Sequence, residues 1–176
     1  MGGILSRSNS AWKVGERAGK RALVRRVPEG VQVAADAVMR SAGRGAGVRL
    51  ARAWEELYGL NPDPSKAYSL AIKAVEDATV KLVCSKHPAP TLGTVISDME
   101  NQKDWRLPMA REDSRALTKD VVIGMLRVLW CGQHDRHGSG EPEKPGNVSR
   151  EEATVAVLLA VTLVGWFDAG IVARRP

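Results

Sequence analysis

Apolar residues recur at helical spacing over most of the chain, in runs separated by Gly, Pro and Asn. The longest run begins at Ser65, where Ala, Leu and Val return at intervals that are mostly three or four residues. It predicts an amphipathic helix over residues 64–84 with its apolar side against a core. Shorter runs of the same period predict further helices over residues 31–42, 48–57, 92–99, 113–131 and 149–170.

Start and stop signals lie between these runs. The Pro-rich segment 61–64 ends one helix, and Thr91 is a suitable N-cap for another. Ser149 and Glu152 predict a capping box at the start of the last helix. No segment alternates between apolar and polar residues over more than a few positions, and glycines interrupt residues 12–26, so the sequence gives no evidence for a sheet. The expected fold class is all-α, an antiparallel helical bundle.

The formal net charge of +6 is concentrated near the N-terminus. Residues 1–53 hold eleven Lys or Arg and three acidic residues, a net charge of +8, which leaves −2 for the remaining residues. We therefore expect a basic, flexible arm over residues 1–30 and one helical domain over residues 31–176. A basic arm favours phosphate-rich partners such as RNA or a nucleotide. The alternative is an arm that is only solvated.

Cysteine content and the length of the apolar runs bear on compartment and assembly. Cys84 and Cys131 can form at most one disulfide, and no signal-peptide pattern precedes them, so we expect a cytoplasmic protein. The most apolar segment, Ala153–Phe167, has fifteen residues, whereas a membrane-spanning helix needs about 20. It predicts a buried helix and no membrane span. Because its apolar surface is wider than one bundle face needs, we also expect a homodimer.

The segment from Leu126 to Gly140 has the highest density of groups that can transfer protons or bind phosphate. Arg127 lies about 150° around its predicted helix from the core-facing side, and His134 would return to within about 20° of Arg127 if the helix continued. An imidazole can transfer a proton near neutral pH while a guanidinium binds phosphate. The candidate catalytic residues are Arg127, His134 and His137, and the candidate phosphate-binding residues are Gln133 and Arg136. Alternatively, Arg127 is a solvated surface residue and the neighbouring cations cap helix carbonyls.

Two Cys-x2-His pairs suggest a different chemistry. Cys84 with His87 and Cys131 with His134 supply the four ligands of a tetrahedral zinc site. Such sites usually belong to small modules that need the metal to fold, whereas this chain has a sufficient helical core. Buried cysteine as a small apolar filler is the commoner case. We therefore expect no metal and no cofactor.

The end of the fifth predicted helix, Leu-Trp-Cys-Gly-Gln-His-Asp-Arg-His-Gly at residues 129–138, is followed by a polar loop and an Ala-rich apolar helix over residues 152–167. This arrangement resembles the abortive-infection C-terminal domain of bacterial defence proteins. That domain is similar to members of the HEPN superfamily, which comprises all-α nucleases and nucleotide-binding domains. The resemblance covers residues 62–175 and implies an all-α bundle.

The resemblance also implies a site. Members that cleave RNA carry an Arg, four to six further residues and then a His at a dimer interface, and they act without a metal. Arg127 and His134 have six intervening residues, with Val128 where the family prefers a polar residue. Aligning His137 and Gly138 with the family's His-Gly leaves residues 130–132 where the Arg should be, which implies an inactive site.

Two functions follow as hypotheses. The first is a non-catalytic or degenerate HEPN-like module that binds RNA, a nucleotide or a partner protein, in bacterial or phage defence. The second is a metal-independent endoribonuclease of the abortive-infection type that acts as a homodimer. We favour the first, because the Arg/His motif is imperfect in either placement.

Overall fold

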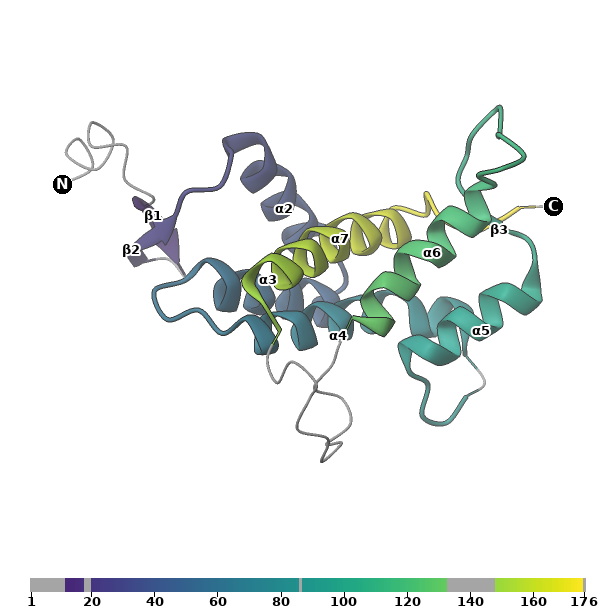
Figure 1. Cartoon of the computed structure of the whole chain (residues 1–176), viewed down its shortest axis with the longest axis horizontal. Helices are drawn as coiled ribbons and strands as arrows, with labels where there is room; N and C mark the ends of the chain where they lie inside the picture. The colour runs from purple at the N-terminus through teal and green to yellow at the C-terminus, as the bar shows by residue number, and fades with distance from the viewer. Residues whose placement is uncertain (1–11, 18–19, 86, 133–147, 176) are drawn as a thin grey trace.

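The computed structural model describes residues 12–17, 20–85, 87–132 and 148–175 (Figure 1). These residues form mostly helix, with six packed helices and two small two-stranded sheets. In chain order the elements are β1 (Trp12–Arg17), β2 (Lys20–Arg25), α2 (Glu29–Ser41), α3 (Arg44–Tyr58), α4 (Pro64–Val83), α5 (Leu92–Gln102), β3 (Trp105–Arg106), α6 (Thr118–Cys131), α7 (Arg150–Asp168) and β4 (Ala173–Arg174). The helical fold is therefore confirmed.

Helix α4 is the central element and packs against α3, α5 and α7 (Figure 1). Its buried side is rich in alanine, with Ala67, Ala71 and Ala74 fully buried, so neighbouring helices can approach closely. Helix α3 runs antiparallel to α4. Arg49, in the first half of α3, pairs at 2.8 Å with Asp77, which lies in the second half of α4.

Helix α7 runs in the same direction as α4. At their starts, the Val148 backbone N–H donates to Ser65 Oγ at 3.2 Å. At their ends, Leu82 of α4 and Phe167 of α7 line one pocket. The bundle is therefore not uniformly antiparallel, and that part of the prediction is wrong for this pair of helices.

The predicted helix starts are confirmed at three positions. The Asp63 side chain accepts a hydrogen bond from the Lys66 backbone N–H at 2.9 Å at the start of α4. Thr91 forms a capping box with Thr94, the third residue of α5. Ser149 Oγ accepts from the Glu152 N–H at 3.1 Å, and the Glu152 carboxylate accepts from the Ser149 N–H at 2.7 Å. Each cap satisfies backbone donors that the helix itself leaves unpaired.

The N-terminal region contradicts the expectation that no sheet is present. Strands β1 and β2 pair antiparallel, with Val14 opposite Leu23, and they contact chiefly each other. Gly15, which argued against order, is needed here, because a Cβ at that position would lie 2.5 Å from the Val24 side chain. The strands have only six residues each, so their alternation was too short to recognise in the sequence.

A second two-stranded sheet ties the C-terminal end of the described chain to the core. In β3, Trp105 pairs with Arg174 of β4. The Trp105 ring is buried, and its Nε1 donates to Gln102 at 2.6 Å. Asp104 accepts from Arg174 Nε at 2.7 Å. Trp105 therefore fills the core from a two-residue strand.

Two helix starts differ from their predictions by four residues or more. Helix α6 begins at Thr118 instead of Asp113, because the Asp113 side chain accepts from the Arg115 backbone N–H at 2.8 Å and holds a turn. Helix α3 begins at Arg44, before the predicted start, and includes Gly47, whose Cβ would lie 2.4 Å from the Met39 carbonyl oxygen. Within the described ranges, no helix has the length and apolar character required to cross a membrane.

Candidate functional site

One buried tyrosine fixes the end of α6, where the Arg/His-rich segment begins. Tyr68 of α4 donates its hydroxyl to the carbonyl oxygens of Val128 and Leu129, at 3.1 and 3.2 Å. A Cβ on Gly132 would lie 2.2 Å from the Tyr68 hydroxyl oxygen. Gly132 has an ordinary helical backbone, so its glycine is required by this close approach and not by its φ angle. The last turn of α6 is therefore held rigidly against α4.

Arg127 lies on the solvent side of α6, as expected from its helical position, with 58% of its side chain exposed. It forms an ion pair with Glu100 of α5, and this hydrogen bond raises the pKa of the Arg127 guanidinium further above its ordinary value. An exposed pair of this kind contributes little stability. It does place a carboxylate where the non-bridging oxygens of a phosphate would need to approach. Arg127 is thus poorly suited to bind phosphate on its own.

The remaining candidate residues of this segment, Gln133, His134, Arg136 and His137, lie outside the described residues. Their convergence with Arg127 therefore stays a prediction.

The two cysteines lie too far apart to bind one zinc ion, so the zinc alternative is wrong for them. Cys84 follows the end of α4, sixteen residues beyond Tyr68, which corresponds to about 24 Å along a helix. Tyr68 contacts the turn of α6 that contains Cys131, so the two cysteines lie at opposite ends of α4. Two thiolates on one zinc lie about 4 Å apart. Within the described part of the chain, no three His, Cys, Asp or Glu side chains form a group able to hold a metal ion.

Cys84, His87 and Asp98 nevertheless lie together at the end of α4. Burial of Cys84, followed by its hydrogen bond to Asp98, raises the pKa of the thiol to about 12. His87 Nε2 lies 3.7 Å from Asp98 Oδ2, so the carboxylate contacts both the thiol and the imidazole. A nucleophilic cysteine needs a base beside it and a lowered pKa. The raised pKa of the Cys84 thiol therefore does not suit a nucleophile.

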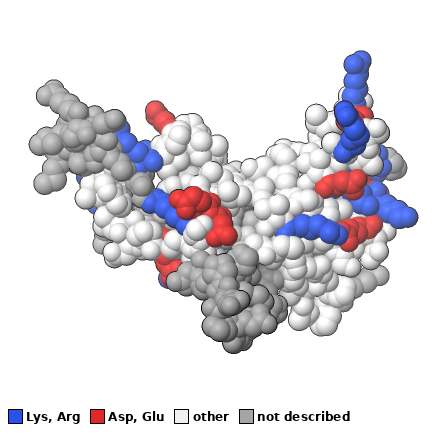
Figure 2. Space-filling model, viewed as in Figure 1, with Lys and Arg blue, Asp and Glu red and all other residues white. Residues whose placement is uncertain are grey.

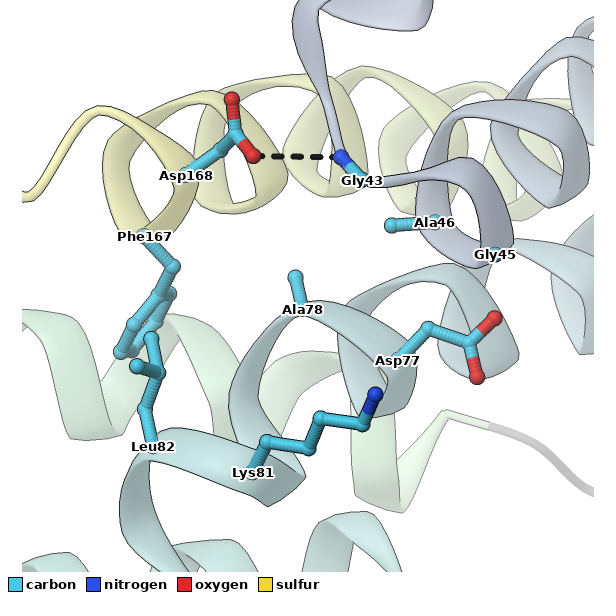
Figure 3. Close-up of a pocket in the computed structure, with 9 residues that line it drawn as sticks. All are labelled: Gly43, Gly45, Ala46, Asp77, Ala78, Lys81, Leu82, Phe167 and Asp168. Carbon is cyan, nitrogen blue, oxygen red and sulfur yellow. Dashed lines mark hydrogen bonds between the residues drawn. The ribbon is translucent and has the colours of Figure 1, made fainter.

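A pocket of about 490 Å³ opens between the start of α3, the second half of α4 and the end of α7 (Figure 3). Asp168 Oδ1 accepts from the Gly43 backbone N–H at 3.2 Å and so caps α3 from another helix. The Lys81 ammonium points toward Asp77 (Figure 3). Asp77 also pairs with Arg49 at 2.8 Å. Two carboxylates therefore face the helix N-terminus at which an anion would otherwise bind. The pocket does not suit a phosphate.

Only an indirect signal for this pocket is present in the sequence. Helix α3 lacks a Ser, Thr, Asp or Asn before its first turn, and Gly43 stands in that place. With glycine as N-cap, the backbone N–H groups at the helix start need a partner other than a local side chain. Nothing in the sequence points to Asp168 as that partner, because 125 residues separate it from Gly43.

The basic residues of the N-terminal region gather on the β1–β2 hairpin. Residues 12–17 and 20–26 hold six Lys or Arg and one Glu. In the backbone register, Arg17 pairs with Lys20 and Glu16 pairs with Arg21. The charged positions of the hairpin are therefore nearly all basic.

The chain was compared with family models, curated proteins and solved structures, and no match was found in any of the three.

Proposed function

We propose that this protein is a non-catalytic helical module that binds RNA through the β1–β2 hairpin. The observation that carries the proposal is the excess of basic residues on this hairpin, six Lys or Arg against one Glu, with Arg17 paired to Lys20 in the strand register. Phosphate contacts by Lys and Arg release counterions and supply most of the affinity for nucleic acid when no base is read specifically. A likeness to the HEPN superfamily is compatible with this proposal and stays a prediction.

The pairing of Arg127 with Glu100 speaks against the alternative, metal-independent cleavage by Arg127 with His134 or His137. A catalytic Arg stabilises the negative charge that develops on the phosphate, and a neighbouring carboxylate opposes that charge. We therefore expect binding without cleavage. Purified protein incubated with single-stranded RNA in excess EDTA should leave the RNA intact, and cleavage that requires both Arg127 and His134 would establish the nuclease instead.

The binding proposal is tested by the salt dependence of affinity for a labelled single-stranded RNA. Changing Lys13, Arg17 and Lys20 to Gln should weaken binding and reduce the slope of log affinity against log salt by about 2, since each phosphate contact contributes about 0.7. The matched control changes Arg40, Arg52 and Arg111 to Gln. These three residues are exposed and lie outside the hairpin, and the change in net charge is the same. An equal effect of both sets would show that only net charge matters and would exclude a hairpin site.

A further inference from the structure

One face of the β1–β2 hairpin carries an apolar pair that the helices leave open. Val14 and Leu23 lie directly opposite each other in the strand register, and they are 38% and 41% exposed. Residues directly opposite each other in an antiparallel pair have Cβ atoms about 5 Å apart, so the two side chains form one continuous apolar surface. We call Val14 and Leu23 the hairpin pair. The two strands contact chiefly each other, and Figure 1 shows them at the edge of the helical bundle.

The opposite face of the ribbon is filled by the hairpin itself. Successive residues of a strand alternate between its two faces, so Gly15 and Val24 share the face that the hairpin pair does not use. A Cβ on Gly15 would lie 2.5 Å from the Val24 side chain, and Val24 is half-buried. The hairpin therefore packs on itself on this face, and its exposed apolar surface lies on the other.

A basic and an aromatic residue lie beside the hairpin pair. Trp12 precedes Val14 by two residues and Arg21 precedes Leu23 by two, so both belong to the same face as the pair. Arg21 is exposed and Trp12 is half-buried. The charges of the whole hairpin, six Lys or Arg against one Glu, complement a polyanion. Apolar surface within such a basic segment suits a ligand that has both flat apolar groups and negative charges, which are the bases and phosphates of a nucleic-acid strand.

We propose that the hairpin pair packs against an unpaired base of a single-stranded RNA, while the basic residues of the hairpin bind the phosphates. This inference rests on the proposed RNA binding and names the class of RNA. In double-stranded RNA the flat faces of the bases are stacked inside the helix, so a duplex offers the hairpin pair no apolar partner. An unpaired base can turn outward and stack on a guanidinium plane or an apolar side chain. The hairpin therefore prefers single-stranded to double-stranded RNA.

The size of the hairpin pair favours a base over a membrane surface. Even a myristoyl chain, with about a dozen CH₂ groups, gives only marginal membrane binding. The exposed parts of Val14 and Leu23 are equivalent to only a few such groups. Contact with a base requires no larger area, because the phosphate contacts supply most of the affinity and the apolar contact has only to distinguish one RNA from another.

Affinities for a labelled single-stranded RNA and for a duplex that contains it, measured over a range of salt concentrations, test the inference. The double variant Val14→Thr, Leu23→Thr removes apolar surface and keeps residues that favour strands. It should weaken single-strand binding by about fivefold, the lower end of what one stacked base contributes, and leave duplex binding unchanged. The slope of log affinity against log salt should stay the same, because the double variant alters no charge.

Two further variants separate the apolar contact from the folding of the hairpin. Val14→Ile with Leu23→Ile retains an apolar surface on strand-favouring residues and should bind single-stranded RNA as the wild type does. Val33→Thr with Leu60→Thr is the matched control. It makes the same chemical change at two residues outside the hairpin, 59% and 53% exposed, and should not affect RNA binding.

The possible outcomes distinguish this inference from the proposed function. Unchanged single-strand binding in the threonine variant of the hairpin pair, or equal affinity of the wild type for the two RNAs, would overturn the inference and leave RNA binding by the hairpin in place. A smaller salt slope in that variant would also overturn it, since the change would then act through the phosphate contacts. Loss of binding to anionic lipid vesicles in that variant, with RNA binding unchanged, would assign the hairpin pair to a membrane surface instead. A wild type that binds no RNA would refute the proposed function and this inference with it.

Discussion

Replacing Gly132 by alanine should destabilise the contact between α6 and α4, because the new Cβ would collide with Tyr68. The added Cβ would lie 2.2 Å from the Tyr68 hydroxyl oxygen, which must move. Overpacking of this kind costs about 1–3 kcal/mol. A Gly→Ala change at a position with helical φ also stabilises by about 0.4–1 kcal/mol through the unfolded chain. We therefore expect a net destabilisation of about 1–2 kcal/mol.

The same substitution should be far less harmful when Tyr68 is phenylalanine. Tyr68→Phe alone should cost about 0.5–1.5 kcal/mol, because its hydrogen bonds to two carbonyls of α6 are lost. Without the hydroxyl, the closest atoms to the new Cβ are Tyr68 Cζ and the Val128 carbonyl oxygen, both at 3.1 Å, which small shifts can relieve. Gly132→Ala should then be nearly neutral. The coupling energy between the two positions is expected to be about 1–2 kcal/mol.

Chemical denaturation of the four proteins of this double-mutant cycle gives the coupling energy directly. Gly124→Ala is the control, because it adds a Cβ to the same helix in open space and should raise the stability of the dilute protein by about 0.5–1 kcal/mol. If Gly132→Ala costs the same with tyrosine or phenylalanine at position 68, the close approach is not the reason for glycine. The account of how α6 is held against α4 would then be wrong.

Three further outcomes follow from single interactions. The Cys84 pKa, raised from 9.0 to about 12, should keep the thiol protonated in the folded protein. Stability should therefore fall as pH rises above about 9, by up to about 1.4 kcal/mol per pH unit, and Cys131 should react with thiol reagents before Cys84 does. The pKa of Asp104 is lowered by its hydrogen bond to Arg174, so Arg174→Gln should raise it toward its ordinary value in an NMR titration. That pair stabilises the fold at neutral pH and is lost as pH falls through the lowered pKa. Ser149→Ala should lower the free energy of unfolding by about 1 kcal/mol, measured by thermal unfolding, because the capping box at the start of α7 is lost. An unchanged stability would show that the capping box is unimportant.

The features predicted correctly are those that local sequence determines. The start of α7 follows from Ser149 and Glu152, which are three residues apart and satisfy each other's backbone groups. The helix over 64–84 follows from apolar residues that recur mostly at intervals of three or four, a spacing that a helix has and a strand does not. Helix existence and caps are encoded within a few residues, so no knowledge of the remaining chain is needed.

The features that sequence reasoning missed depend on partners far away along the chain. Asp168 caps α3 across 125 residues, and the Arg127 and Glu100 side chains pair across 27. The second pairing changes the chemistry expected at Arg127, because a helical wheel can place the guanidinium in solvent but cannot show which carboxylate stands beside it. The β1–β2 hairpin was missed because its stability depends on the register between strands, which a single short strand does not reveal.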